Sequence, residues 1–97
     1  MGAEGLLQVA PLARLRWDKI DGLHVLLSPE RGLALNPTAT EVVQLCDGTR
    51  TAGAIVRCCV EKYAGDVVER QAEVETDVRA WLAELVGRGL VVERPRG

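Results

Sequence analysis

Polar and apolar residues alternate along two runs near the start of the chain, and this alternation predicts two β-strands. In the first run, RLRWD at residues 14–18, Leu15 and Trp17 face one way and the charged residues face the other. The second run, LHVLLS at residues 23–28, alternates in the same way. An Asp-Gly pair in the turn between them is typical of tight β-hairpins. We therefore expect two paired, half-buried strands, with Trp17 among the large residues of the core.

A third extended run, Leu33 to Leu35, follows a second turn that begins at Pro29 and ends at Gly32. Proline suits the start of such a turn, and glycine leaves the backbone free at its end. Three strands joined by two short turns predict an antiparallel meander, which is about the minimum for a stable sheet when helices cover one of its faces.

The spacing of apolar residues then changes from every second residue to every third or fourth, which predicts helices. Asn36 is a good N-cap for the first helix, and Pro37 fits its first position. A second capping pair, Thr38 and Glu41, leaves the start open by two residues. Gly48 is suited to end the helix. The apolar stripe of this helix consists of Ala39, Val42, Val43 and Cys46.

Two further helices complete the pattern. Thr51 caps the second helix, which carries Ile55 and Tyr63 on its apolar stripe. A polar, acidic connection at residues 64–73 separates it from a third helix, expected from Val74 to Arg88. The predicted order of three strands and three helices, βββααα, describes a small α+β domain with a winged-helix-like arrangement, in which a three-stranded antiparallel sheet is followed by a three-helix bundle.

The two ends of the chain lack such periodicity. We expect residues 1–11 to form a flexible tail with an apolar centre, and residues 93–97 to form a second tail. The folded domain is then residues 12–92, and its last part, Leu90 to Val92, is a short extended segment.

Length and charge exclude some classes of function. A chain of 97 residues predicts one domain. A net charge of −2 argues against nucleic acid as a partner, because phosphate binding needs a basic face. No apolar run approaches the roughly 20 residues that cross a bilayer. The start of the chain also lacks the basic region of a secretory signal. We therefore expect a cytoplasmic protein without a membrane partner.

Residue types that carry chemistry are few. His24 is the only histidine and has no cysteine or serine near it in the sequence. The three cysteines include the adjacent pair Cys58 and Cys59, but no second pair completes a zinc motif. We expect these cysteines to be small buried residues in a reducing compartment. We therefore expect no catalytic residue, no metal, no cofactor and no enzyme activity.

An ordered set of motifs resembles the PqqD family, whose members take part in the biosynthesis of pyrroloquinoline quinone (PQQ). The most specific pieces are Leu35-Asn36, the block LCDG at residues 45–48, and Asp77-Val78 three residues before Trp81. Glu41, Thr51 and Ile55 also fit the family pattern. The resemblance extends over residues 12–92.

The resemblance implies a peptide carrier that does no chemistry of its own. Members of this family are similar to recognition elements for ribosomally synthesized and post-translationally modified peptides (RiPPs). They hold the precursor peptide, protein A of the pathway, and present it to a radical S-adenosylmethionine (SAM) enzyme, protein E. In this group the leader part of the peptide adds as a further strand beside the third strand, in a groove walled by the third helix.

The residues of this chain agree with such a site. A three-stranded meander leaves open edges, and the third run is a short edge with apolar side chains, which suits the addition of a peptide strand. The third helix carries more apolar residues than one packing seam needs, so each of them can belong either to the core or to the groove. The candidate peptide-binding residues are Leu33, Ala34, Leu35, Val78, Trp81, Leu82 and Leu85.

Two alternative functions stay open. A winged-helix DNA-binding regulator would use basic residues such as Arg14 and Arg57, although these do not form one dense stripe. An enzyme subunit would use Cys58-Cys59 in redox chemistry. A homodimer is a further expectation, because the apolar tail around Leu6 and an open strand edge can both pair with a second copy.

Overall fold

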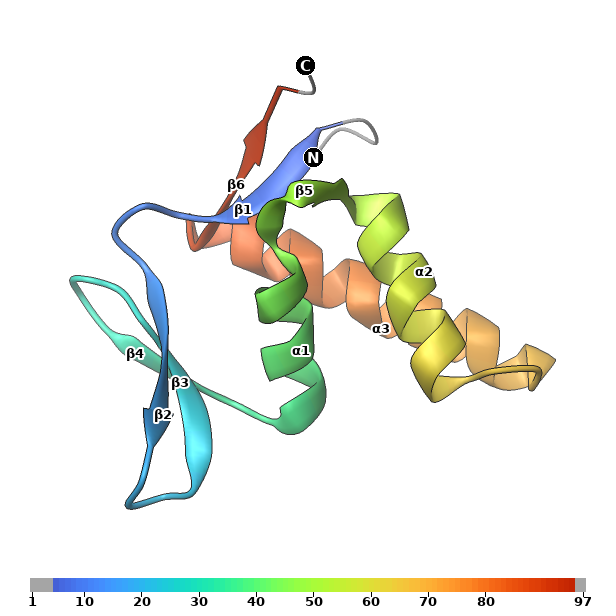
Figure 1. The fold of residues 1–97 in the computed structure, drawn as a ribbon, viewed down its shortest axis with the longest axis horizontal. Helices are drawn as coiled ribbons and strands as arrows, with labels where there is room; N and C mark the ends of the chain where they lie inside the picture. The colour runs from blue at the N-terminus through green and yellow to red at the C-terminus, as the bar shows by residue number, and fades with distance from the viewer. Residues whose placement is uncertain (1–4, 96–97) are drawn as a thin grey trace.

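The computed structural model describes residues 5–95, which form two antiparallel sheets and three helices (Figure 1). The first sheet has the strand order β2-β3-β4, with β2 at Arg14–Asp18, β3 at Leu23–Leu27 and β4 at Gly32–Leu35. The predicted α+β class and the predicted antiparallel meander are therefore confirmed. The winged-helix arrangement stays a prediction.

A second sheet, with the order β5-β1-β6, joins parts of the chain that lie far apart in the sequence. Its strands are β1 at Leu6–Val9, β5 at Asp47–Thr51 and β6 at Val91–Arg94. The central strand, β1, pairs antiparallel with both neighbours. Figure 1 shows β1 and β6 side by side, so that the two ends of the described chain meet in one sheet.

The prediction of a flexible tail at residues 1–11 is wrong for Leu6–Val9, because these residues form the central strand β1. Leu7 is fully buried. The partners of these four residues come from the middle and the end of the chain, so their pairing is not encoded locally. The C-terminal tail likewise begins later than predicted, since β6 reaches Arg94. The remaining tail residues 1–4, 96 and 97 lie outside the described residues.

The first two helices begin where the capping residues predict. Helix α1, at Pro37–Leu45, takes the earlier of the two starts, because the Asn36 side chain accepts a hydrogen bond from the N–H of Ala39 at 2.7 Å. Helix α2, at Ala52–Tyr63, is capped by Thr51. The short connection between the predicted helix end at Gly48 and the cap at Thr51 forms part of strand β5.

Helix α3, at Val68–Gly87, begins six residues earlier than predicted. The prediction of an acidic connection is therefore wrong for residues 68–73, which form the first turns of this helix. These turns are mostly exposed and so carry no apolar stripe that a periodicity argument could detect. Within residues 5–95, no helix has both the length and the apolar character that a membrane crossing requires.

The core lies between the helices and receives side chains from both sheets, including Leu7, Leu26 and Leu35. Trp17 is not part of it, because 53% of its surface is exposed, so the prediction for this residue is wrong. It stands on β2, an edge strand, and its ring meets His24 edge-on at 5.0 Å between ring centroids. The alternation in β2 identified a face of the sheet, but α1 packs mainly on β3 and β4.

Candidate functional site

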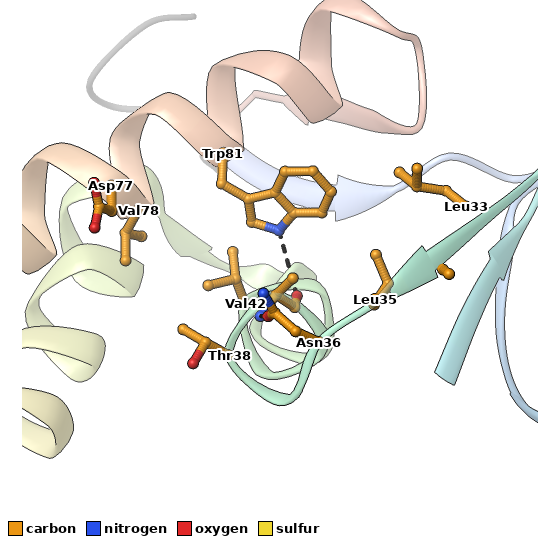
Figure 2. A pocket seen from close by; sticks show the side chains of 10 residues that line it. Leu33, Leu35, Asn36, Thr38, Val42, Asp77, Val78 and Trp81 are labelled. Carbon is orange, nitrogen blue, oxygen red and sulfur yellow. Dashed lines mark hydrogen bonds between the residues drawn. The ribbon is translucent and has the colours of Figure 1, made fainter. Parts of the chain in front are cut away.

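A groove of about 480 Å³ lies between the edge strand β4 and helix α3, with the start of helix α1 at its base (Figure 2). We call it the β4–α3 groove. Strand β4 and the following cap contribute one wall, α3 contributes the opposite wall, and α1 lies between them. The lining residues are Leu33, Ala34, Leu35, Asn36, Thr38, Ala39, Val42, Asp77, Val78 and Trp81.

Strand β4 has no neighbour on its outer side within the described chain, so part of its backbone is free to bind a partner. At the hairpin end the N–H of Ser28 donates to the carbonyl of Arg31 at 2.9 Å, and the register continues from there without a bulge. Hydrogen-bonded and non-bonded pairs alternate in an antiparallel ladder. Leu33 and Leu35 therefore bond to β3, whereas the N–H and C=O of Ala34 point to the open edge.

The junction between β4 and α1 fixes the base of the groove. The side chain of Asn36 caps the helix, and its carbonyl accepts a hydrogen bond from the hydroxyl of Thr40 at 2.9 Å. These bonds hold the first turn of α1 against the end of the strand. The family-like Leu35-Asn36 pair thus has a local physical role, which is to turn the chain from an edge strand into a helix.

Trp81 links the α3 wall of the groove to its base on α1. Its indole N–H donates to the carbonyl of Ala39 on α1 at 3.3 Å, and Figure 2 shows the ring between α3 and the end of β4. The side chain is half-buried, so one part packs on the core and another part faces the groove. An aromatic ring that lies partly in the core and partly in a groove is suited to contact a bound peptide.

The predicted site residues fall into two groups. Leu33, Ala34, Leu35, Val78 and Trp81 line the groove. Leu82 and Leu85 do not line it, and both side chains are 0% exposed in the core beneath α3. Whether any of the seven contacts a peptide stays a prediction.

Sequence reasoning missed the contribution of α1 and of one charged residue. Thr38, Ala39 and Val42 line the groove because α1 packs between β4 and α3, an arrangement that no local pattern encodes. Asn36 and Asp77 belong to the motifs that carried the family resemblance, so the signal that could have identified them was present. Asp77 is the one charged residue among the ten that line the groove.

Glu41 fixes α1, and hence the base of the groove, to α2. Its carboxylate accepts a hydrogen bond from Lys62 Nζ at 2.6 Å and another from the hydroxyl of Tyr63. The bonds from Lys62 and Tyr63 hold the pKa of Glu41 below its usual value, and the bond to Glu41 raises the pKa of Tyr63. This cluster lies on the α2 side of α1 and none of its members lines the groove.

Two of the three cysteines, Cys46 and Cys59, are buried thiols. Burial raises the pKa of Cys46 to about 12 and also raises that of Cys59, so both stay protonated, poorly nucleophilic thiols. Cys58 is exposed, and all three are free cysteines. Residues 5–95 contain no group of three or more His, Cys, Asp or Glu side chains placed to hold a metal ion.

Comparison with known proteins gives consistent relatives. The family profile described as coenzyme PQQ synthesis protein D (PqqD) matches residues 23–91. A PqqA binding protein of Rhodopseudomonas palustris (strain BisB5) is 42% identical over 81 residues, which cover 84% of this chain and 76% of the relative. A PqqA binding protein of Methylococcus capsulatus (strain Bath) is 33% identical over 88 residues, which cover 91% and 88% of the two chains.

A solved structure supports the same relationship. The solution NMR structure of the PqqD truncation of Methylobacterium extorquens PqqCD superimposes with a TM-score of 0.71 and 29% sequence identity. The match covers 95% of this chain and 94% of that one. The truncation is described as a functional and stand-alone RiPP recognition element.

Proposed function

Because the chain belongs to the PqqD family, we propose that it binds the PqqA precursor peptide of PQQ biosynthesis and presents it to a radical SAM enzyme. The predicted family resemblance is confirmed by the profile and by relatives that share 33–42% of their residues with this chain. The prediction of an accessory protein, rather than an enzyme, is confirmed by the same family membership. The named relatives bind PqqA, and the proposal extends that property to this chain.

The open edge of β4 beside the groove is the observation that carries the proposal. A peptide strand that pairs with β4 would lie about 4.8 Å from it. It would accept a hydrogen bond from the free N–H of Ala34 and donate one to the free C=O of Ala34. Backbone pairing of this kind supplies affinity for an extended peptide largely independently of its sequence.

The groove supplies the side-chain contacts. A strand added to β4 projects alternate side chains to opposite faces of the sheet, and one of these faces continues into the apolar part of the β4–α3 groove. Leu33 and Leu35 point to the same face of β4, opposite Val78 and Trp81 of α3. Apolar peptide residues spaced two apart would therefore contact both walls. Leu82 and Leu85 would support α3 from below without touching the peptide.

Presentation to the radical SAM enzyme follows from this mode of binding. A recognition site that holds only a short extended segment leaves the rest of the precursor free to enter the active site of a second protein. We place this exchange in the cytoplasm, where a ribosomal peptide is made. One copy of the chain supplies both the edge and the groove, so a homodimer is not needed for the proposed site.

The two open edges of the meander offer a matched test. By the same alternation, the backbone of Ala34 faces the outer edge of β4, and that of Trp17 faces the outer edge of β2. Proline at either position removes one free N–H and leaves the pairing with β3 intact. We expect Ala34→Pro to weaken binding of PqqA by about tenfold, about 1.4 kcal/mol, in a calorimetric titration, and Trp17→Pro to leave it unchanged.

The opposite ranking would assign the peptide to β2. Equal affinity of both variants and the unmodified chain would show that neither edge pairs with the peptide, and the strand-addition proposal would fail. A parallel titration with duplex DNA, in which Arg57→Ala is the control variant, tests the alternative of a DNA-binding regulator. A second titration in the presence of the radical SAM enzyme tests presentation, because a three-component complex is expected.

A further inference from the structure

Asp77 stands at one end of the β4–α3 groove as an unpaired negative charge. It is exposed, and none of the four ion pairs formed within residues 5–95 includes it. The other nine lining residues are uncharged, so Asp77 alone sets the sign of the charge that the groove itself presents. Resting on the proposed function, we propose that Asp77 selects a lysine or arginine at the N-terminal end of the bound peptide segment.

The position of Asp77 relative to β4 indicates which end of an antiparallel peptide lies beside it. Figure 2 shows Asp77 and Leu33 at opposite ends of the groove, with Trp81 between them. Strand β4 runs from Leu33 toward Asn36, that is, toward the end where Asp77 lies. A peptide that pairs antiparallel with β4 would run the other way. Its first bound residues would therefore lie near Asp77, and its last bound residues near Leu33.

The chemistry of a covered carboxylate favours a basic partner. A peptide strand laid along the groove removes water from around Asp77, and an unpaired charge in such a place is costly. A lysine or arginine side chain pairs with it and keeps its own aliphatic stem against the apolar lining. Glu73 lies one helical turn before Asp77 and is also exposed, so the local field is negative and an acidic peptide residue is repelled there.

Two cations of α2 and α3 are engaged in ion pairs of their own. Arg79 forms an ion pair with Glu75 at 3.9 Å, and Lys62 of α2 is bonded to Glu41. Neither side chain lines the groove. Discrimination against acidic peptides together with attraction of basic ones gives selectivity, since a purely apolar groove would accept either. The proposed ligand is thus an extended apolar segment preceded by a basic residue.

A double-mutant cycle between protein and peptide tests this inference. The protein variants are Asp77→Asn, Asp77→Lys and the control Glu69→Gln, which changes an exposed carboxylate on the same helix outside the groove. The peptides are PqqA and its variants in which each lysine or arginine is replaced singly by glutamine. Affinities are measured by calorimetry at low and at high salt.

We expect Asp77→Asn to weaken PqqA binding by about three- to tenfold at low salt, and less at high salt. One peptide variant, changed on the N-terminal side of the bound apolar residues, should show the same loss with unmodified protein and no further loss with Asp77→Asn. Replacing that peptide residue by glutamate should restore binding to Asp77→Lys. Glu69→Gln should bind as the unmodified chain does.

Three outcomes would overturn the inference and leave the proposed function standing. In the first, Asp77→Asn binds PqqA as tightly as the unmodified chain. In the second, it weakens every peptide equally, so that no basic residue is coupled to it. In the third, the coupled residue lies on the C-terminal side of the bound segment, which reverses the direction. Failure of the unmodified chain to bind PqqA at all would remove both the proposed function and this inference.

Discussion

The two sheets of this protein have three strands each, but the chain builds them in opposite ways. The meander β2-β3-β4 is made of consecutive strands joined by short turns, whereas β5-β1-β6 takes its strands from the middle, the start and the end of the described chain. The meander leaves Trp17 and Ile20 exposed, at 53% and 94% of their surfaces. The second sheet buries Leu7 and Val91 almost completely.

This difference separates two tasks. A sheet that ties distant parts of the chain together contributes mainly to stability, because its strands pair only when the whole domain folds. A local meander at the side of the molecule keeps free edges, which can pair with another chain. Figure 1 shows α1 between the meander and α2, so that one short helix connects the sheet proposed to bind with the rest of the core.

Among the changes that test this comparison of the two sheets, Leu7→Ala is expected to have the largest effect on folding stability. Leu7 is 0% exposed at the centre of the second sheet, and truncating such a leucine costs about 3 kcal/mol of folding free energy. The matched control is Leu12→Ala, since Leu12 is 77% exposed and should contribute less than about 0.5 kcal/mol. Urea denaturation measures both. Equal, small losses would mean that β1 is not part of the stable core, and the tail predicted from the sequence would be right after all.

The smallest effect is expected from Glu41→Gln, which weakens the attachment of α1 to α2. Since the pKa of Glu41 is lowered by folding, its contribution to stability is complete above the unfolded value, about 4.3, and is lost as the pH falls through the folded value. The variant should therefore be less stable than the unmodified chain at pH 7, and this difference should shrink at an acidic pH below the unfolded value. Urea midpoints at the two pH values measure this.

The raised pKa of Tyr63 predicts that the unmodified chain also loses stability at alkaline pH. The contribution of Tyr63 to folding stability is complete below its unfolded pKa, about 10, and disappears as the pH rises through its folded pKa. The control for Glu41→Gln is Glu84→Gln, which removes an exposed carboxylate that pairs with Arg88, the C-cap residue of α3. A difference between Glu41→Gln and the unmodified chain that does not change with pH would contradict the role given to Glu41.

The meander could be predicted from sequence because its signals are local. Alternation in residues 14–18 and 23–28 and the turn residues between the strands determine both strands and their pairing. The same reasoning missed β1, and it predicted Leu90 to Val92 as an extended segment without its place in a sheet, because both strands pair only with partners far away in sequence. The first turns of α3 were missed for another reason, which is that an exposed helical turn has no apolar stripe.

The candidate site was predictable in part. Apolar spacing placed Val78, Trp81, Leu82 and Leu85 on α3, but the periodicity does not give the rotation of the helix about its axis. That rotation puts Trp81 and Asp77 at the groove, and Leu82 in the core. The edge strand was correctly identified from its place at the end of the meander.

The position of the two tryptophans allows the most direct test of the central claim, that the peptide binds in the β4–α3 groove. Trp81 lines this groove, and Trp17 stands on the opposite edge strand β2. With both replaced by 5-fluorotryptophan, the protein gives two ¹⁹F signals, which Trp17→Phe assigns, and unlabelled PqqA contributes none. We predict that titration with PqqA shifts the Trp81 signal and leaves the Trp17 signal in place. A shift of the Trp17 signal alone would contradict the claim and move the peptide to β2.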